Sequence, residues 1–312
     1  MTVHYEPMVA VDRPAKPPAH PGLLADLVTL TKPRITLMVV VTMLGGIWLA
    51  RHASLRLAFA LSAAEGARLA AAVIGTALVV GAANTLNMYL ERVSDGFMVR
   101  TRNRPLPTGR LPAGLALAFG IALGAVSVPL LALEVNAITG LLAAVALVSY
   151  VALYTPLKRK TTISLLIGAV PGAIPPLLGW TAVKGRIELP GLLLFGVLFL
   201  WQIPHFLAIA TFRRDDYARA GLKVLPVERG DRVTRLHIVG YLVALVAVSL
   251  ALAAAGVGGR LYLGAAAFLG AGFFGFGLWG LRRSAGERWA RGLFAVSIVY
   301  LVLLFAALMV SA

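Results

Sequence analysis

The sequence predicts an all-α integral membrane protein, a bundle of about nine transmembrane helices. Of its 312 residues, 59% are hydrophobic and only 13% are charged, whereas soluble domains average about 45–50% apolar and about 25% charged residues. The apolar residues form segments whose lengths are close to that of a membrane-spanning helix, which is about 20 residues. The predicted spans are 35–50, 69–90, 112–133, 136–156, 162–183, 189–211, 236–256, 261–281 and 292–311.

The basic residues predict the orientation of this bundle. With the N-terminus in the cytoplasm, 23 of the 29 lysines and arginines fall in the cytoplasmic tail and loops. Lysine and arginine retain loops on that side of the membrane, and nine spans then put the C-terminus outside. Topology therefore accounts for the net charge of +16, and we expect no nucleic-acid partner.

The remaining composition divides the chain into a tail and one domain. Residues 1–21 are rich in Pro, His and charge and lack an apolar core, which predicts a disordered cytoplasmic tail rather than a targeting peptide. Residues 22–312 are predicted to form a single membrane-embedded domain. Its first segment, Leu23 to Thr31, is typical of a short amphipathic helix on the membrane surface. The absence of cysteine excludes disulfides and thiolate metal sites.

The strongest functional signal lies at the end of the second span. Asn87, Glu91 and Asp95 are four residues apart, so a helix would present them on one face. Amide and carboxylate oxygens are ligands that Mg²⁺ accepts. Polar residues that cap a helix end are the plainer interpretation, but such side chains near membrane depth are candidates for function. We therefore predict a magnesium site here.

Arginines follow at every second position, at Arg100, Arg102 and Arg104. In an extended segment this spacing would point all three the same way. Anchoring at a lipid headgroup layer is the alternative for any one of them. Three aligned guanidinium groups beside a metal site favour diphosphate recognition, because guanidinium binds phosphate oxygens bidentately. The two motifs together predict a lipid diphosphate as a substrate.

A second polar loop follows the sixth span, on the same predicted side of the membrane. Asp215 and Asp216 could hold a second metal ion there, with Arg213 adding to the diphosphate site; a solvated loop is the alternative. Acidic residues concentrate in these two loops. Because basic residues alone would set the topology, we interpret the two loops as halves of one polar site.

Two further candidate groups lie near the ends of other spans. Tyr154 and Lys158, at the inner end of the fourth span, are ordinary interface residues, but Lys158 could neutralise a departing diphosphate. In the sixth span, Trp201 and His205 flank Pro204. His205 is either a histidine satisfied by the proline break or a contact to a large planar substrate or its metal.

These motifs resemble the UbiA superfamily of intramembrane prenyltransferases, and within it the branch that farnesylates haem. The resemblance covers about residues 25 to 311 and rests on three stretches: RTRNRPLPTGR from Arg100 to Arg110, WQIPHF from Trp201 to Phe206, and Asp216 to Gly221 followed by Leu225 to Val227. Many members carry aspartate at three positions where this sequence has Glu91, Val93 and Asp95. Glutamate can still bind magnesium, whereas valine cannot.

The resemblance implies a UbiA-like fold with its active site at the cytoplasmic face of a bacterial-type cell membrane. It implies Mg²⁺-dependent transfer of a farnesyl group from farnesyl diphosphate to a vinyl group of haem b, with addition of water. Haem b would be a substrate, and a downstream haem-modifying enzyme a partner. The implied roles are metal binding by Asn87, Glu91, Asp95, Asp215 and Asp216; diphosphate binding by Arg100, Arg102, Arg104, Lys158 and Arg213; and haem contact by His205, Trp201 and Tyr154.

Three alternatives stay open. The chain could prenylate an aromatic acid or another quinone precursor, it could transport haem or an anionic lipid, or it could be a structural subunit of a respiratory assembly. Transporters tend to place polar groups at the bilayer midplane, whereas the acidic residues here gather at one face. A structural subunit gives no reason for the two polar loops. No nucleotide-binding loop, Ser-His-Asp pattern or zinc spacing is present, which favours metal-assisted departure of a leaving group.

Overall fold

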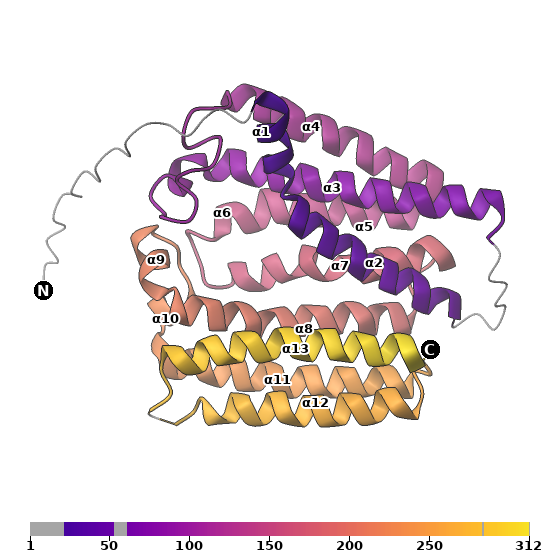
Figure 1. Cartoon of the computed structure of the whole chain (residues 1–312), viewed down its shortest axis with the longest axis vertical. Helices are drawn as coiled ribbons and strands as arrows, with labels where there is room; N and C mark the ends of the chain where they lie inside the picture. The colour runs from indigo at the N-terminus through magenta and orange to yellow at the C-terminus, as the bar shows by residue number, and fades with distance from the viewer. Residues whose placement is uncertain (1–21, 53–60, 283, 312) are drawn as a thin grey trace, which may run out of the picture.

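The computed structural model describes residues 22–52, 61–282 and 284–311, and this part of the chain is helical without a strand (Figure 1). The predicted tail, residues 1–21, lies outside the described residues. The elements in chain order are α1 (Leu23–Thr31), α2 (Pro33–His52), α3 (Ala63–Asp95), α4 (Ala113–Leu130), η1 (Leu131–Val135), α5 (Ala137–Val148), η2 (Ser149–Tyr154), α6 (Thr155–Leu157), α7 (Ser164–Lys184), α8 (Leu189–Phe212), α9 (Arg214–Arg219), α10 (Leu225–Glu228), α11 (Gly230–Ala254), α12 (Arg260–Trp279) and α13 (Glu287–Ser311).

The predicted membrane architecture is confirmed. The described residues contain nine helical spans that are long and apolar enough to cross a bilayer. η1 extends the span that starts with α4, and η2 and α6 extend the span that starts with α5. The helix predicted from Leu23 to Thr31 is present as α1, with Leu24 exposed and Leu30 fully buried, and its place on the membrane surface stays a prediction.

The spans pack as two groups of helices. One hydrophobic core lies mainly among α8, α11, α12 and α13 and contains Leu242, Phe273 and Tyr300. The other lies among α2, α3, α5 and α7 and contains Met43 and Leu178. α7 packs on α8 and joins the two groups, as the middle of Figure 1 shows.

α3 is longer than the prediction of 69–90. A capping box starts it, because Ser62 Oγ accepts from the Glu65 backbone N–H while the Glu65 carboxylate accepts from the Ser62 N–H. Its 33 residues make a helix of about 50 Å, whereas the hydrocarbon core is about 30 Å thick. Its last turns, which include Glu91 and Asp95, therefore stay helical beyond the apolar layer.

Both predicted polar loops lie at the same end of the bundle. In Figure 1 the loop between α3 and α4 and the helices α9 and α10 all lie at the left-hand end. α1 lies against α3 at this end, and an ion pair of 3.3 Å between Asp26 Oδ1 and Arg110 Nη2 ties it to the α3–α4 loop. The fold thus gathers the polar segments on one face.

Two glycines allow α2 and α7 to touch through their backbones. A Cβ atom added at Gly46 would lie 2.1 Å from the Pro176 carbonyl oxygen, and one added at Gly179 would lie 2.1 Å from the Met43 oxygen. Close approach of this kind is how small residues stabilise helix pairs in lipid, where van der Waals packing replaces the hydrophobic effect.

We expect Gly46→Ala to lower the thermal unfolding midpoint of the detergent-solubilised protein. The new methyl group meets a carbonyl oxygen that cannot move without shifting α7, and such overpacking costs about 1–3 kcal/mol. Gly272→Ala on α12 is the matched control, because its Cβ would meet nothing within 4 Å. Equal midpoints for the two variants would contradict the close helix contact.

Candidate active site

The predicted row on α3 forms, and each of its members contacts a basic side chain. Lys158 Nζ donates to Glu91 Oε1 at 2.9 Å, and Arg104 Nη1 donates to Asp95 Oδ2 at 2.6 Å. Lys32 Nζ lies 3.5 Å from Asn87 Oδ1. We call Asn87, Glu91 and Asp95 the α3 row, and Lys32, Arg104 and Lys158 its counter-cations.

The counter-cations come from three distant parts of the chain. Lys32 occupies the turn between α1 and α2 in a left-handed conformation with φ 49°, the sole non-glycine residue with positive φ among those described. Arg104 comes from the loop after α3, and Lys158 follows α6. Because all three converge on one helix face, the row is neutralised by the tertiary fold rather than by local sequence.

The Asn87 amide is oriented by a short chain of hydrogen bonds. Thr155 Oγ1 donates to the Tyr150 carbonyl at 2.8 Å, five residues back, which is the spacing of the π-helical segment η2. Its single hydrogen is then used, so Thr155 accepts from Asn87 Nδ2 at 3.1 Å. The amide oxygen of Asn87 is therefore left as an acceptor, and Lys32 Nζ lies 3.5 Å from it.

Asp95 carries the feature that best fits a metal ion. Its side chain is 1% exposed, and Oδ2 takes the bond from Arg104. Oδ1 is buried without any hydrogen-bond partner among the described residues. A buried carboxylate oxygen is costly unless it is paired or binds a cation. With the Asn87 oxygen and the Glu91 carboxylate on the same face, the donor set suits Mg²⁺.

Burial and the neighbouring charges set the pKa values of the two lysines. Burial, followed by the positive charges of Arg104 and Lys158, lowers the pKa of Lys32 to about 8. Burial also disfavours the charged form of Lys158, but Tyr154 and Glu91 outweigh it and raise the pKa of Lys158 above its ordinary value. These neighbours therefore favour the charged form of Lys158, and an anion bound beside Lys32 would raise the lowered pKa of that lysine.

The prediction that Arg100, Arg102 and Arg104 lie in an extended segment is wrong. Residues 96–111 form successive turns, with the Arg102 N–H bonded to the Met98 oxygen and the Arg104 N–H to the Thr101 oxygen. Arg104 reaches the α3 row, whereas Arg100 and Arg102 are exposed. Thr101, which is buried, donates to the Asp95 carbonyl at 2.8 Å and holds this turn against the end of α3.

The two aspartates of the second loop do not join the row. Asp216 pairs with Arg213 at 3.5 Å and with Arg219, while Asp215 is exposed. No group of three or more acidic or histidine side chains placed for a metal ion occurs in the described part of the chain. A metal role for Asp215 or Asp216 stays a prediction.

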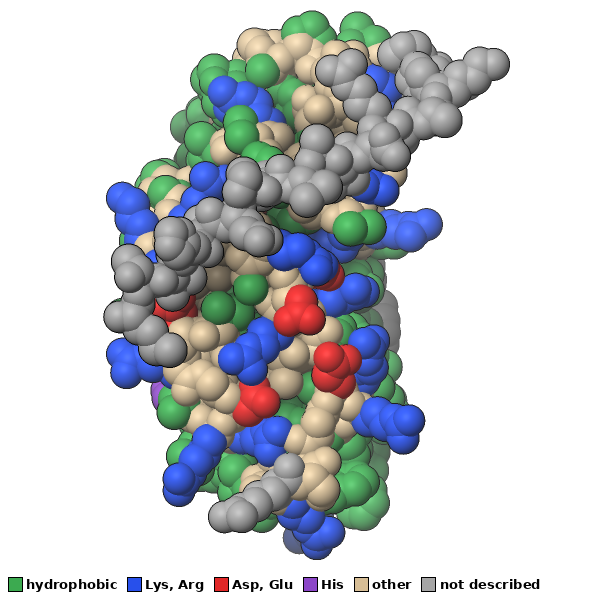
Figure 2. Space-filling model, turned by 90° about the vertical axis from the view of Figure 1, so that its left-hand side faces the viewer, with side chains coloured by type: hydrophobic (Ala, Val, Ile, Leu, Met, Phe, Trp, Pro, Cys, Tyr) green, Lys and Arg blue, Asp and Glu red, His purple; other side chains and the backbone are tan. Residues whose placement is uncertain are grey.

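Backbone and electrostatic contacts nevertheless connect the second loop to the row. The Lys223 N–H donates to the Lys158 carbonyl at 2.9 Å. Tyr217 on α9 lies within the electrostatic influence of Arg100, Tyr154 and Lys158, and burial raises its pKa. Figure 2 shows the resulting face, with acidic side chains set among many lysines and arginines. The two loops thus share one polar face, as the sequence predicts.

The residues predicted to contact haem lie on two different helices. Tyr154 borders the row, with Lys158 Nζ 4.3 Å from its ring centre. Trp201 and His205 instead face α13: Trp201 Nε1 donates to the Ser297 carbonyl at 2.7 Å, and the His205 ring stacks on Trp201 with centroids 4.7 Å apart. The structure therefore separates a polar group at the end of the bundle from an aromatic group inside it.

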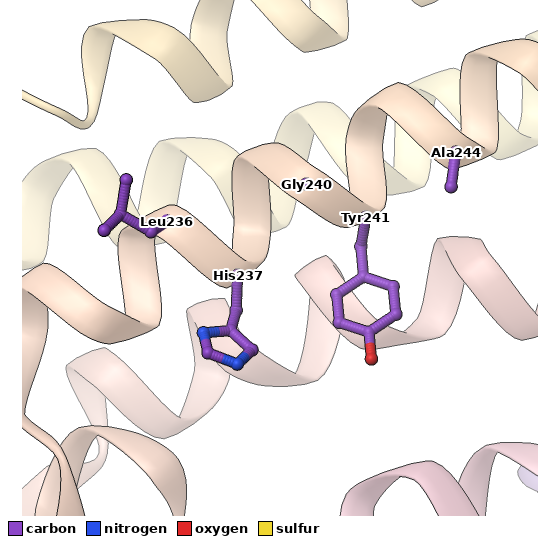
Figure 3. A pocket seen from close by; sticks show the side chains of 5 residues that line it. All are labelled: Leu236, His237, Gly240, Tyr241 and Ala244. Carbon is purple, nitrogen blue, oxygen red and sulfur yellow. The ribbon is translucent and has the colours of Figure 1, made fainter.

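A groove on α11 contains none of the predicted site residues. Its volume is about 430 Å³, and Figure 3 shows the side chains that line it projecting from this one helix. Its lining is Leu236, His237, Gly240, Tyr241 and Ala244.

Sequence reasoning missed Lys32 and Thr155. Lys32 precedes Pro33, so it marks the end of a helix in sequence, and its contact with Asn87 spans 55 positions. Thr155 is one of many polar residues near a helix end.

A helical membrane bundle with a row of amide and carboxylate side chains and cations at one end suits an enzyme that acts on a phosphorylated lipid. The chain belongs to the UbiA prenyltransferase family, whose model matches residues 39–309. It is similar to a protoheme IX farnesyltransferase of Sorangium cellulosum strain So ce56, with 62% identity over 281 residues, 88% of this chain and 100% of the relative. It is 50% identical over 289 residues to a Myxococcus xanthus strain DK1622 protein of the same name, covering 92% and 95% of the two chains.

Solved structures support the fold. A digeranylgeranylglyceryl phosphate synthase aligns with a TM-score of 0.79 and 17% identity, covering 92% of this chain and 98% of that chain. A UbiA homologue from Archaeoglobus fulgidus bound to DMAPP and Mg²⁺ aligns with a TM-score of 0.62 and 14% identity, covering 91% and 99%. The chain is therefore an integral membrane prenyltransferase of the UbiA fold.

We expect Gly221→Ala to loosen the second loop, because Gly221 holds a φ of +66°, and a left-handed backbone costs an alanine roughly 1–2 kcal/mol. Trypsin should cleave this loop faster in the variant than in the original protein. Gly240→Ala is the control, since it lies in α11 and its Cβ would meet nothing within 4 Å. Unchanged cleavage in Gly221→Ala would show that the turn does not hold the loop.

Proposed function

We propose that this enzyme transfers a farnesyl group from farnesyl diphosphate to a vinyl group of protohaem IX, haem b. The bond between farnesyl C1 and the diphosphate oxygen breaks, and diphosphate leaves with the electron pair. The terminal vinyl carbon bonds to C1, and water adds to the cationic carbon next to the porphyrin and releases a proton. The product carries a hydroxyethylfarnesyl side chain.

The observation that carries this proposal is the α3 row with its counter-cations. Two carboxylates and an amide oxygen lie on one face, and Asp95 Oδ1 is buried without a partner. Asn87, Glu91 and Asp95 would hold Mg²⁺, with Asp215 or Asp216 as further proposed ligands. The ion, when bound, neutralises charge that develops on the leaving diphosphate.

The counter-cations have a second use once substrate is bound. Lysine and arginine that pair with the row in the protein alone can turn to diphosphate oxygens when a metal ion takes over the carboxylates. Arg100, Arg102 and Arg213 are exposed at the same face and extend this positive surface. Positive groups held in place near the leaving oxygen stabilise the transition state without reorganisation.

The acceptor is assigned from the relatives and from the aromatic group on α8. Proteins named protoheme IX farnesyltransferase align over nearly the whole chain. Trp201 and His205 offer a flat aromatic surface and an imidazole for a planar iron porphyrin, and Tyr154 borders the diphosphate side. The polar face would lie in the cytoplasm of a bacterial-type membrane, with the C-terminus outside and a haem-modifying enzyme taking the product.

Turnover tests the proposal directly. Purified protein in detergent is incubated with haem b, farnesyl diphosphate and Mg²⁺, with and without chelator. The haem products are separated by chromatography and identified by mass spectrometry. A farnesylated and hydrated haem that is absent with chelator is expected. Unchanged haem in the presence of bound farnesyl diphosphate would overturn the acceptor, and an aromatic acid would then be tested.

Asp95→Asn should reduce turnover by at least about 100-fold, because the amide keeps the size of the side chain but loses the charge that a metal ligand supplies. Asp231→Asn is the matched control: this aspartate is half-exposed on α11 and pairs with Arg214 at 3.3 Å and Arg235 at 3.9 Å, neither of which contacts the row. Initial rates at saturating substrates check the difference. Full activity in Asp95→Asn would remove Asp95 from the metal site.

Lys158→Met should strengthen Mg²⁺ binding severalfold without diphosphate, because Glu91 loses the cation that competes for it, and should weaken farnesyl diphosphate binding. Titration calorimetry with each ligand, without haem, measures both affinities. Lys160→Met removes the same charge from an exposed position two residues away and controls for general electrostatics. If both variants changed metal affinity equally, Lys158 would not compete for the row.

A further inference from the structure

His205 belongs to a relay of hydrogen bonds that the farnesyl chemistry does not require. Its Nδ1 lies 2.7 Å from Ser297 Oγ on α13. Ser297 is fully buried, and its Oγ in turn lies 2.6 Å from the Phe294 carbonyl oxygen. These contacts join α8 to α13, and His205 and Ser297 are 92 positions apart in sequence.

The relay determines which nitrogen of the ring carries the hydrogen. A carbonyl oxygen can only accept, so the single hydroxyl hydrogen of Ser297 is donated to Phe294. Ser297 Oγ must then accept from His205, which places the hydrogen on Nδ1. In the neutral ring, Nε2 is left with a free lone pair.

The surroundings favour that neutral ring and leave Nε2 available. Trp201 stacks on it at 4.7 Å, Phe294 lies at the same centroid distance, and Phe206 approaches edge-on at 5.5 Å. No carboxylate bonds to the ring in the described part of the chain. Nε2 has no hydrogen-bond partner there, and the atom is not fully buried.

We propose that Ser297 is a positioning residue that fixes His205 in the Nδ1-protonated form, so that Nε2 binds the iron of the haem acceptor. The inference rests on the proposed haem substrate. A histidine that ligates a metal characteristically donates its other N–H to a fixed acceptor, which sets the tautomer and the ring orientation. Trp201 adds to the orientation, because its indole donates to the backbone oxygen of the same Ser297 at 2.7 Å.

The test uses ferric haem titrated into the full-length detergent-solubilised protein, followed by absorption and electron paramagnetic resonance. The original protein should give the spectrum of imidazole-ligated haem. His205→Ala should lose that spectrum and regain it when imidazole is added. Ser297→Ala should bind haem about 10–100-fold more weakly, with less of it ligated, while Ser297→Thr, which keeps a hydroxyl, should restore both.

The control is Ser249→Ala, a fully buried serine on α11 that bonds to Tyr300 at 2.9 Å and does not touch His205. Magnesium-dependent binding of farnesyl diphosphate to every variant verifies folding. If Ser297→Ala matches the original spectrum and affinity, or Ser297→Thr fails like Ser297→Ala, Ser297 does not position His205. If the original protein binds farnesyl diphosphate but no haem, the proposed acceptor itself fails.

Discussion

The structure depends on pairing carboxylates with cations at the end of a helix, where one of these carboxylates is almost fully buried. Asp95 is 1% exposed, and a buried charge is tolerated only when it is paired and hydrogen-bonded. Arg104 pairs with one oxygen of Asp95, and Thr101 holds the loop that carries Arg104. The form of the α3–α4 loop is therefore a consequence of the charge it must neutralise.

The same requirement explains features of the fold that apolar packing does not. The π-helical turn η2 brings Thr155 to Asn87 and Lys158 to Glu91. Lys32 adopts a left-handed backbone, which costs a non-glycine residue free energy, at the point where its amine faces Asn87. π-helical turns and strained residues concentrate at functional sites, and both occur here around one helix face.

The sequence was sufficient for features with a regular local pattern. Hydropathy located the nine spans found among the described residues, because each span must satisfy its own backbone polar groups. The spacing of four placed Asn87, Glu91 and Asp95 on one helix face. The extended form assumed for Arg100 to Arg104 failed because the buried Thr101 and the pairing of Arg104 with Asp95 favour turns. Lys32, Thr155 and Ser297 depend on partners 55, 68 and 92 positions away, which no local pattern encodes.

α8 connects the two proposed substrate sites. Its Trp201 and His205 face α13, and its C-terminal end leads into α9 and the loop that is bonded to Lys158. From His205 to the end of α8 at Phe212 the helix rises only about 10 Å. A planar acceptor held at His205 would therefore lie one short stretch of α8 away from the loop bonded to Lys158, and the diphosphate would be held beside Lys158 at the α3 row. Rigid placement of two reactants is itself a large part of catalysis, because it removes the entropy cost of bringing them together.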